Sequence, residues 1–384
     1  MSTTSERING FDALRTVAMW LGIVLHSIVV YKATPEPNWP RDPTLSVHFF
    51  DWLYDYIHIF RMPLFFLVAG FFARLVILRS GPAYFITQRF RRIVVPFIIG
   101  VITIVPLTIF PFLFYKFYNV EHLPAQEAWH SCLLQMFRWN GLVHLWFLYY
   151  LIIFYALSVG AKFVAGKLSI VVPGKWKRSM EKIGILRLLA VSGVLFLILW
   201  VNQMALPPVY TGIRPNLFYI LYYGFFYGCG WCMQFNMKSV TSLTRWGWPL
   251  FITGTGLSVL VFLRQDAGYP VMDYLLHALQ TISLVAGISG LFIRYCHAES
   301  KVWRYFSDAA YWVYLIHMCI VSSMQVLLIN SSVVGWVRLP LVLIVAFGLS
   351  LLSYQFLVRY TVIGEFLHGK RKKPEKKWAM APIK

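Results

Sequence analysis

The sequence predicts an all-α integral membrane protein with about ten transmembrane helices, and its composition and apolar segments carry that prediction. Of its 384 residues, 59% are hydrophobic and 13% are charged, which is more apolar than a soluble domain of this length can bury. A spanning helix needs about 20 mostly apolar residues. Ten such stretches occur, at 11–31, 49–78, 93–115, 142–163, 184–202, 215–235, 247–263, 273–295, 306–329 and 339–361.

The placement of lysine and arginine predicts the orientation of these helices. With the N-terminus inside, the inner segments hold 26 of the 35 Lys and Arg residues and the outer segments hold seven. Cytoplasmic loops retain these residues during insertion, so we expect both termini in the cytoplasm. The net charge of +20 then mostly reflects topology, with anionic membrane lipid as the default partner and no nucleic acid partner expected.

The chain is expected to form one polytopic membrane domain, residues 1–365, followed by a basic cytoplasmic tail, residues 366–384. The longest predicted loops, at 32–48, 116–141 and 163–183, leave no room for a separate soluble domain. Cys229 and Cys232 in "CGWC" have the spacing of a redox pair, but thiols near the cytoplasmic side stay reduced, so we expect them to serve in packing. No metal site is expected.

The first apolar stretch carries an arginine and a histidine on one face. Successive helical residues turn by about 100° and rise by about 1.5 Å, so Arg15 and His26 differ by roughly 20° in facing and lie roughly 16 Å apart. Met19 and Gly22 share this face. The stripe is either a groove that leads a reagent from the inner surface toward His26 or a close helix-packing seam. Because imidazole works as a base near neutral pH, His26 is the candidate catalytic residue.

The second stretch begins outside with a polar strip. Asp51, Asp55, His58 and Arg61 lie within about a third of the helix circumference. Ionisable groups within a span usually face a protein interior or a cavity and are candidates for function. The strip either balances buried charges by pairing or lines a site for a hydroxyl-rich acceptor.

Further polar residues fall near the same depth or at the inner surface. His317 shares a face with Tyr314 at a depth close to that of His26, and His144 opens the fourth stretch at the outer boundary. His277 has no comparable polar strip, so we expect it to pack. Arg89 and Arg92 lie one turn apart before the third stretch, either as membrane anchors or as a phosphate-binding pair.

The motifs resemble those of the membrane acyltransferase-3 family. The segments "RINGFDALRTVAMWLGIVLH", "FRMPLFFLVAGFFARL", "RFRRIVVPFIIG", "HLWFLYYLI" and "SDAAYWVYLIH" follow one another in the family's order. Within the family, these segments are most similar to those of the glucan biosynthesis protein C branch. The members of this branch resemble succinyl transferases acting on periplasmic glucans. "LVAGFF" departs from the pattern, because Ala69 stands where many relatives have a serine.

The resemblance implies a location in the bacterial cytoplasmic (inner) membrane, an acyl-CoA donor such as succinyl-CoA and a periplasmic glucan or other glycan acceptor. It implies no permanently bound cofactor, His26 as the family's essential histidine and Arg15 as its arginine. We expect Arg15, Arg89 and Arg92 to hold the CoA phosphates. The acceptor side would be lined by Asp55, His58, Arg61, His144, Tyr314 and His317.

Two other functions fit the same residues. A proton-coupled exporter of oligosaccharide or lipid would use His26, His317, Asp55 and Arg61 as a relay. A structural subunit would recruit cytosolic enzymes through its basic tail. The residues leave open whether His26 acts as a general base or as an acyl acceptor.

Overall fold

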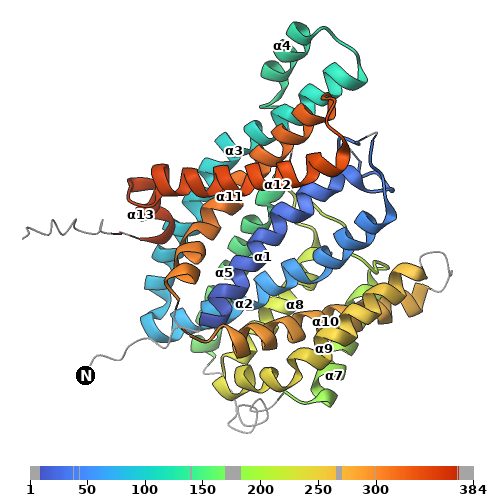
Figure 1. Ribbon diagram of the computed structural model, residues 1–384. Helices are drawn as coiled ribbons and strands as arrows, with labels where there is room; N and C mark the ends of the chain where they lie inside the picture. The colour runs from blue at the N-terminus through green and yellow to red at the C-terminus, as the bar shows by residue number, and fades with distance from the viewer. Residues whose placement is uncertain are drawn as a thin grey trace, which may run out of the picture.

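The computed structural model describes residues 9–37, 39–42, 44–138, 141–168, 183–264, 270–298, 300–369 and 371, and these residues form helices and contain no β-strand (Figure 1). The α-helices are α1 (Asn9–Ile28), α2 (His48–Arg89), α3 (Val95–Phe114), α4 (Ala125–Gln135), α5 (Trp146–Lys167), α7 (Ile185–Val201), α8 (Leu217–Met233), α9 (Met237–Leu263), α10 (Pro270–Tyr295), α11 (Lys301–Ile329), α12 (Gly335–Ser353) and α13 (Val362–His368). The 3-10 helices are η1 (Val29–Tyr31) and η4 (Val143–Leu145), and the π-helices are η2 (Phe90–Val94), η3 (Tyr115–Val120) and η5 (Tyr354–Val358).

Every one of the ten predicted stretches is helical, which confirms an all-α, multi-pass membrane protein. Seven helical runs among the described residues are long and apolar enough to cross a membrane: Asn9–Tyr31, His48–Val120, Val143–Lys167, Met237–Leu263, Pro270–Tyr295, Lys301–Ile329 and Gly335–Val358. The count of ten and the cytoplasmic location of both termini stay predictions.

The difference between seven and ten has a structural reason. The 73-residue run His48–Val120 contains both the second and the third predicted stretch. Its backbone leaves the helical conformation at Gly81, with φ 79° and ψ 164°, a region that glycine enters without the steric cost a side chain brings. Pro82 follows, where a helix can restart without the N–H that proline lacks. The other two predicted stretches are α7 and α8, which have 17 residues each and fall below the usual spanning length.

Helix α1 lies inside the bundle. Its apolar residues pack against α2, α10 and α11, and Figure 1 shows it running beside α2 and α11. Helix α9 packs along α10, and α8 packs along α2. Because α1 is enclosed by other helices, its polar side chains meet protein groups, as expected for ionisable residues within a span.

Two segments differ from the expected loops and tail. The predicted outer loop 116–141 contains η3 and the helix α4, which stands apart from the bundle in Figure 1. The predicted boundary between membrane domain and tail, at residue 365, falls inside α13. Beyond α13, Arg371 Nη2 lies 2.6 Å from Asp308 Oδ2 of α11, so the tail begins with an anchor to the bundle. Residues 372–384 lie outside the described part of the chain.

Candidate active site

Three histidines from separate helices meet at the end of α1. The His26 ring centroid lies 5.5 Å from that of His317 on α11, and the His317 centroid lies 5.3 Å from that of His144 in η4. Trp39, in the loop after α1, stacks on the His26 ring at 5.9 Å with an interplanar angle of 7°. His26 is half-buried, and its Nδ1 is buried without a hydrogen-bond partner in the described structure.

Backbone carbonyls fix the tautomers of two of these histidines. His317 Nδ1 donates to the carbonyl oxygens of Tyr314, at 2.7 Å, and Val313, at 3.1 Å. His144 Nε2 donates to the carbonyl oxygen of Leu315 at 3.0 Å. Since a carbonyl only accepts, the neutral rings carry their lone pairs on His317 Nε2 and His144 Nδ1. Both of these atoms are buried and unpartnered within the described residues, so both are proton acceptors aimed at the protein interior.

An arginine from α2 lies beside this cluster of histidines. A Cβ added to Gly22 would lie 2.2 Å from Arg61 Nη1 and 3.8 Å from His317 Nε2. The guanidinium therefore occupies the space that the missing side chain of Gly22 leaves, beside the His317 lone pair. Arg61 Nε is also buried without a partner in the described structure. The site combines unprotonated imidazole nitrogens with a cation that has spare hydrogen-bond donors.

Two side chains hold this cluster in place. The Gln325 side chain on α11 donates to the carbonyl oxygens of His26, at 2.9 Å, and Ser27, at 3.2 Å. These carbonyls belong to the last turn of α1, where intrahelical donors run out. On the other side, the Tyr314 hydroxyl donates to the His144 carbonyl oxygen at 2.8 Å. Gln325 is thus a positioning residue for His26, and Tyr314 one for His144.

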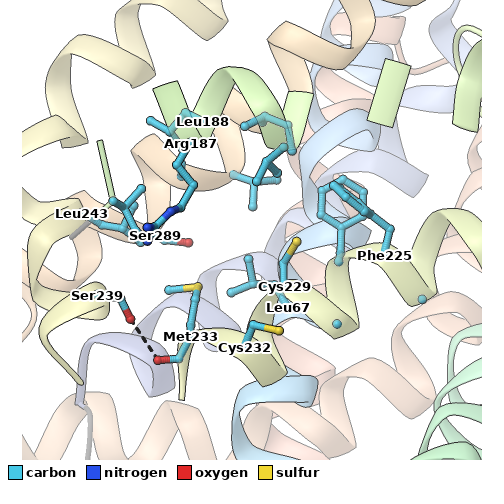
Figure 2. A pocket seen from close by; sticks show the side chains of 18 residues that line it. Leu67, Arg187, Leu188, Phe225, Cys229, Cys232, Met233, Ser239, Leu243 and Ser289 are labelled. Atoms are coloured by element: carbon cyan, nitrogen blue, oxygen red, sulfur yellow. Dashed lines mark hydrogen bonds between the residues drawn. The ribbon is translucent and has the colours of Figure 1, made fainter. Parts of the chain in front are cut away.

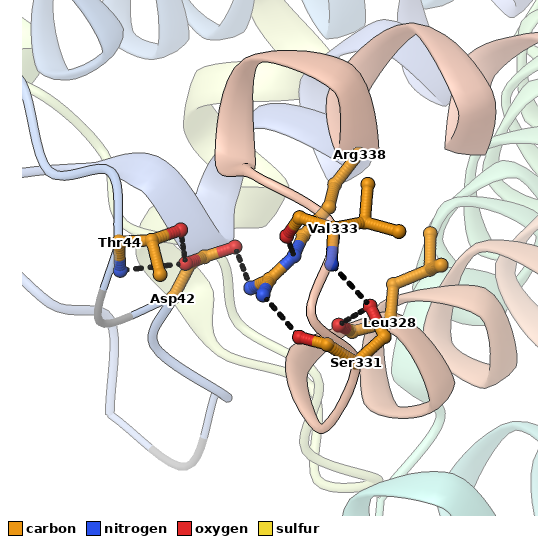
Figure 3. A network of polar contacts seen from close by, with 6 residues as sticks. All are labelled: Asp42, Thr44, Leu328, Ser331, Val333 and Arg338. Carbon is orange, nitrogen blue, oxygen red and sulfur yellow. Dashed lines mark hydrogen bonds and ion pairs between the residues drawn. The ribbon is translucent and has the colours of Figure 1, made fainter.

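The loop that carries Trp39 is fastened by a buried ion pair (Figure 3). Arg338 Nη1 of α12 donates to Asp42 Oδ2 at 2.7 Å, and Arg338 Nη2 donates to the Ser331 carbonyl oxygen at 2.9 Å. Asp42 Oδ1 accepts from the backbone and hydroxyl of Thr44. Arg338 and Asp42 are 3% and 1% exposed, so neither charge could be left alone at low cost. The pair holds the Trp39 loop against the turn between α11 and α12.

The predicted polar strip on α2 does not form one wall. Asp51 accepts from the backbone N–H groups of Ala33 and Thr34 at 3.0 and 3.1 Å, so it anchors the loop after α1. Asp55 faces a different cavity, between α2, α9 and α10. His58 Nε2 donates to the Pro207 carbonyl oxygen at 2.9 Å. Asp55 and Arg61 are six residues apart, which turns their facings by about 120°.

Of the predicted acceptor-side residues, the structure brings Arg61, His144, Tyr314 and His317 together with His26. It places Asp55 and His58 outside that cluster. His277, which we expected to pack, lines the same cavity as Asp55.

The three arginines predicted to hold CoA phosphates have local partners. Arg15 Nη2 lies 3.3 Å from Asp12 Oδ1 and 3.4 Å from Ser307 Oγ. Arg92 Nη2 donates to the His368 carbonyl oxygen at 3.4 Å. The Arg89 guanidinium lies over the rings of Phe85 and Tyr155. Arg15 lies near the start of α11 and Arg92 lies at the end of α13, whereas Arg89 packs toward α5.

The predicted groove along α1 is filled with side chains. Met19 is 8% exposed and packs in the core, and Arg61 takes the space over Gly22. The stripe is therefore a packing seam in this structure. A donor could pass along it only if Met19 and Arg61 changed rotamer.

The largest of the cavities that we describe lies elsewhere, between α2, α7, α8, α9 and α10 (Figure 2). Its volume is about 780 Å³. The labelled side chains in Figure 2 are mostly apolar, with Arg187 reaching in from α7. Cys229 and Cys232 of the "CGWC" motif line this cavity as free thiols, and no disulfide joins them. None of the three histidines lines its wall.

Comparison with known proteins assigns the chain to a family. The family model of the acyltransferase domain, acyltransferase 3, matches residues 8–355, so the chain belongs to this family of membrane acyltransferases. It is similar to proteins named glucans biosynthesis protein C from Escherichia coli strain SMS-3-5 / SECEC and strain HS (O9:H4). Each is 22% identical over 395 residues, which cover 95% of this chain and 95% of the relative. No solved structure matches the chain.

Sequence reasoning missed two residues of the site. Gln325 is a polar residue in an apolar stretch, and the rule that such residues carry function could have marked it. Trp39 lies in a loop, and no periodicity links it to His26. The loop that carries it is joined to α12 by the Asp42 and Arg338 pair, whose members are 296 residues apart.

Proposed function

We propose that this membrane acyltransferase moves a succinyl group from succinyl-CoA to hydroxyls of a glucan on the periplasmic side of the inner membrane. The observation that carries the proposal is the cluster of His26, His317 and His144 beside the Arg61 guanidinium. The names of the relatives support a glucan as acceptor. The family supports acyl transfer as the reaction.

The cluster has the groups that this reaction needs. The sugar hydroxyl oxygen attacks the thioester carbonyl carbon, a C–O bond forms, and the C–S bond breaks. His26 accepts the hydroxyl proton and returns a proton to the leaving CoA thiolate, so charge balances over the cycle. The same histidine could instead accept the acyl group first. Arg61 donates to the oxyanion that develops on the carbonyl oxygen, in a site where water is scarce.

Succinate gives Arg61 a second task. A guanidinium can grip a carboxylate through two parallel hydrogen bonds, whereas an ammonium acts as a point charge. The donor would approach from the Arg15 end of α1, with Met19 and Arg61 both changing rotamer. A methionine side chain is unbranched and flexible, so it can move aside.

The test of the proposal is succinyl transfer by purified protein. Wild type, His26→Ala and His130→Ala receive radiolabelled succinyl-CoA and glucan, and mass spectrometry locates added succinyl groups. His130 lies on the exposed face of α4 and serves as the control. We expect transfer by wild type and by the control, and a loss of at least about 10²-fold in His26→Ala, the lower end of general-base contributions. Near-normal turnover in His26→Ala would remove the assignment. Movement of unmodified glucan without label would favour the exporter.

The donor is tested by replacing the arginine. Arg61→Lys keeps the positive charge but removes the two-pronged donor, so we expect succinyl transfer to fall more than acetyl transfer when both CoA esters are compared. Equal losses for the two donors would restrict Arg61 to the oxyanion or to structure.

A further inference from the structure

A second cavity, of about 210 Å³, opens near the end of α9 and the start of α10. It lies between α2, α9, α10 and residues 205–206, which precede α8. Unlike the 780 Å³ cavity, it has many polar side chains in its wall. They include Trp52, Asp55, Arg264, Asp273, His277 and Gln280.

The deepest of these side chains have polar atoms without partners. Gln280 is 3% exposed and His277 is 9% exposed, and Gln280 Oε1 and His277 Nδ1 are both buried and unpartnered among the described residues. Trp52 Nε1 and Arg264 Nε share this condition. A buried polar atom without a partner is unfavourable, because it has lost its bonds to water without replacing them. These four atoms offer donors and acceptors that a polar ligand in the cavity would satisfy.

The cavity is open on one side. Trp52, Asp55, Arg264 and Asp273 are partly exposed, whereas His277 and Gln280 form the buried floor. A ligand could therefore come from outside the protein, and only one end of it would be fully enclosed. The volume is below the roughly 300–1,000 Å³ of sites for drug-sized molecules, which points to something smaller, such as a single ring.

The chemistry of the wall selects the class of ligand. Carboxylates accept hydrogen bonds, arginine and indole nitrogens donate them, and amide and imidazole groups do both. A sugar ring carries hydroxyls that both donate and accept, and its C–H faces can lie on an aromatic ring. Trp52 offers such a ring, held by stacking on Tyr56 at 5.3 Å. Two carboxylates against one guanidinium disfavour an anionic ligand such as a CoA phosphate.

We propose that this cavity binds a sugar unit of the acceptor glucan, a neighbour of the unit that is acylated. The inference rests on the proposed function. The cavity is linked to the histidine cluster through α2, because Asp55 lines the cavity and Arg61 reaches the cluster about 9 Å further along the helix axis. His58 lies between them and holds Pro207, whose neighbour Leu206 is part of the cavity wall.

The test measures binding of gluco-oligosaccharides of increasing length by calorimetry, with His26→Ala protein so that no reaction intervenes. We expect affinity to rise with length in His26→Ala protein. Adding Gln280→Leu or Asp273→Asn should weaken binding of the longer oligosaccharides at least tenfold. Gln135→Leu, on the exposed face of α4, is the matched control. Asp273→Asn lies at the partly exposed rim, so it keeps the test valid if Gln280→Leu lowers the yield of folded protein.

A second measurement separates this inference from the proposed function. With His26 intact, the cavity variants should raise the acceptor KM for long oligosaccharides and leave kcat unchanged. If transfer proceeds and the variants leave both affinity and KM at control values, the cavity holds water only and the inference is wrong. If wild type transfers no acyl group but the variants still weaken oligosaccharide binding, the proposed function fails and the sugar site stands.

Discussion

At the scale of single residues, Gly22 decides where Arg61 can lie. The guanidinium nitrogen Nη1 would be 2.2 Å from a Cβ at this position, far inside van der Waals contact. We predict that Gly22→Ala displaces Arg61 from the His317 lone pair and lowers kcat by about 10²–10³, the range for loss of one oxyanion donor. Initial rates of acyl transfer measure the effect.

The matched control is Gly160→Ala on α5, because a Cβ there meets nothing within 4 Å. Both variants should reach the membrane in similar amounts, since alanine favours helix more than glycine does. Gly22→Ala with the control's activity would mean that Arg61 takes no part in the reaction.

Some of the contacts between site residues could be predicted from the sequence and others could not. Helical geometry alone put Arg15 and His26 on one face and His317 at a similar depth. It could not show that the His144 ring bonds to Leu315, 171 residues away, because helix packing decides that contact. Helical geometry also grouped Asp55 and Arg61 on one polar strip. The two residues differ by about 120° in facing, so they contact different neighbours.

At the scale of elements, the loop after α1 depends on α12 through one buried ion pair. Arg338→Ala would leave the Asp42 carboxylate buried and unpaired, and we predict a loss of about 3–5 kcal/mol in stability. Asp42→Asn combined with Arg338→Met removes both charges and should cost clearly less than Arg338→Ala. Thermal unfolding in detergent compares the variants.

Acyl-transfer activity provides a second test of the Asp42 and Arg338 ion pair. If the loop holds Trp39 on His26, Arg338→Ala should also lower acyl transfer at temperatures where the protein is still folded. Arg41→Ala is the control, since Arg41 is exposed and makes one hydrogen bond of 3.3 Å with Ser46. Stability equal to that of the control would show that the buried pair contributes nothing to the fold.

The elements themselves were largely predictable from apolar length. Each of the ten apolar stretches became a helix because a membrane requires the backbone groups to bond within the protein, and a single segment of about 20 residues does so as a helix. The break at Gly81 was the harder feature, since a helix that stops for one residue changes neither composition nor hydropathy. Helix α4 was also missed, because it is short and has no long apolar run that would mark it as a helix.

At the scale of the whole molecule, contacts at α11 bear on the topology. Arg15, near the start of α1, lies 3.4 Å from Ser307 Oγ, and Arg371, after α13, lies 2.6 Å from the adjacent Asp308. The described beginning and end of the chain therefore meet at one end of α11. Ends on one side of a membrane require an even number of crossings, which agrees with the predicted ten and also with eight, the number if α7 and α8 do not cross.

We predict that reporter fusions will place both ends on the cytoplasmic side. A fluorescent protein fused after Lys384 should fold and fluoresce, because it stays inside, and alkaline phosphatase at the same position should be inactive. Alkaline phosphatase inserted after His122, just before α4, should be active, because three crossings separate it from the N-terminus. If alkaline phosphatase at the C-terminus were active, the number of crossings would have to be odd. Arg15 and Arg371 would then have to be separated by the bilayer, which their contacts with neighbouring residues of α11 do not allow.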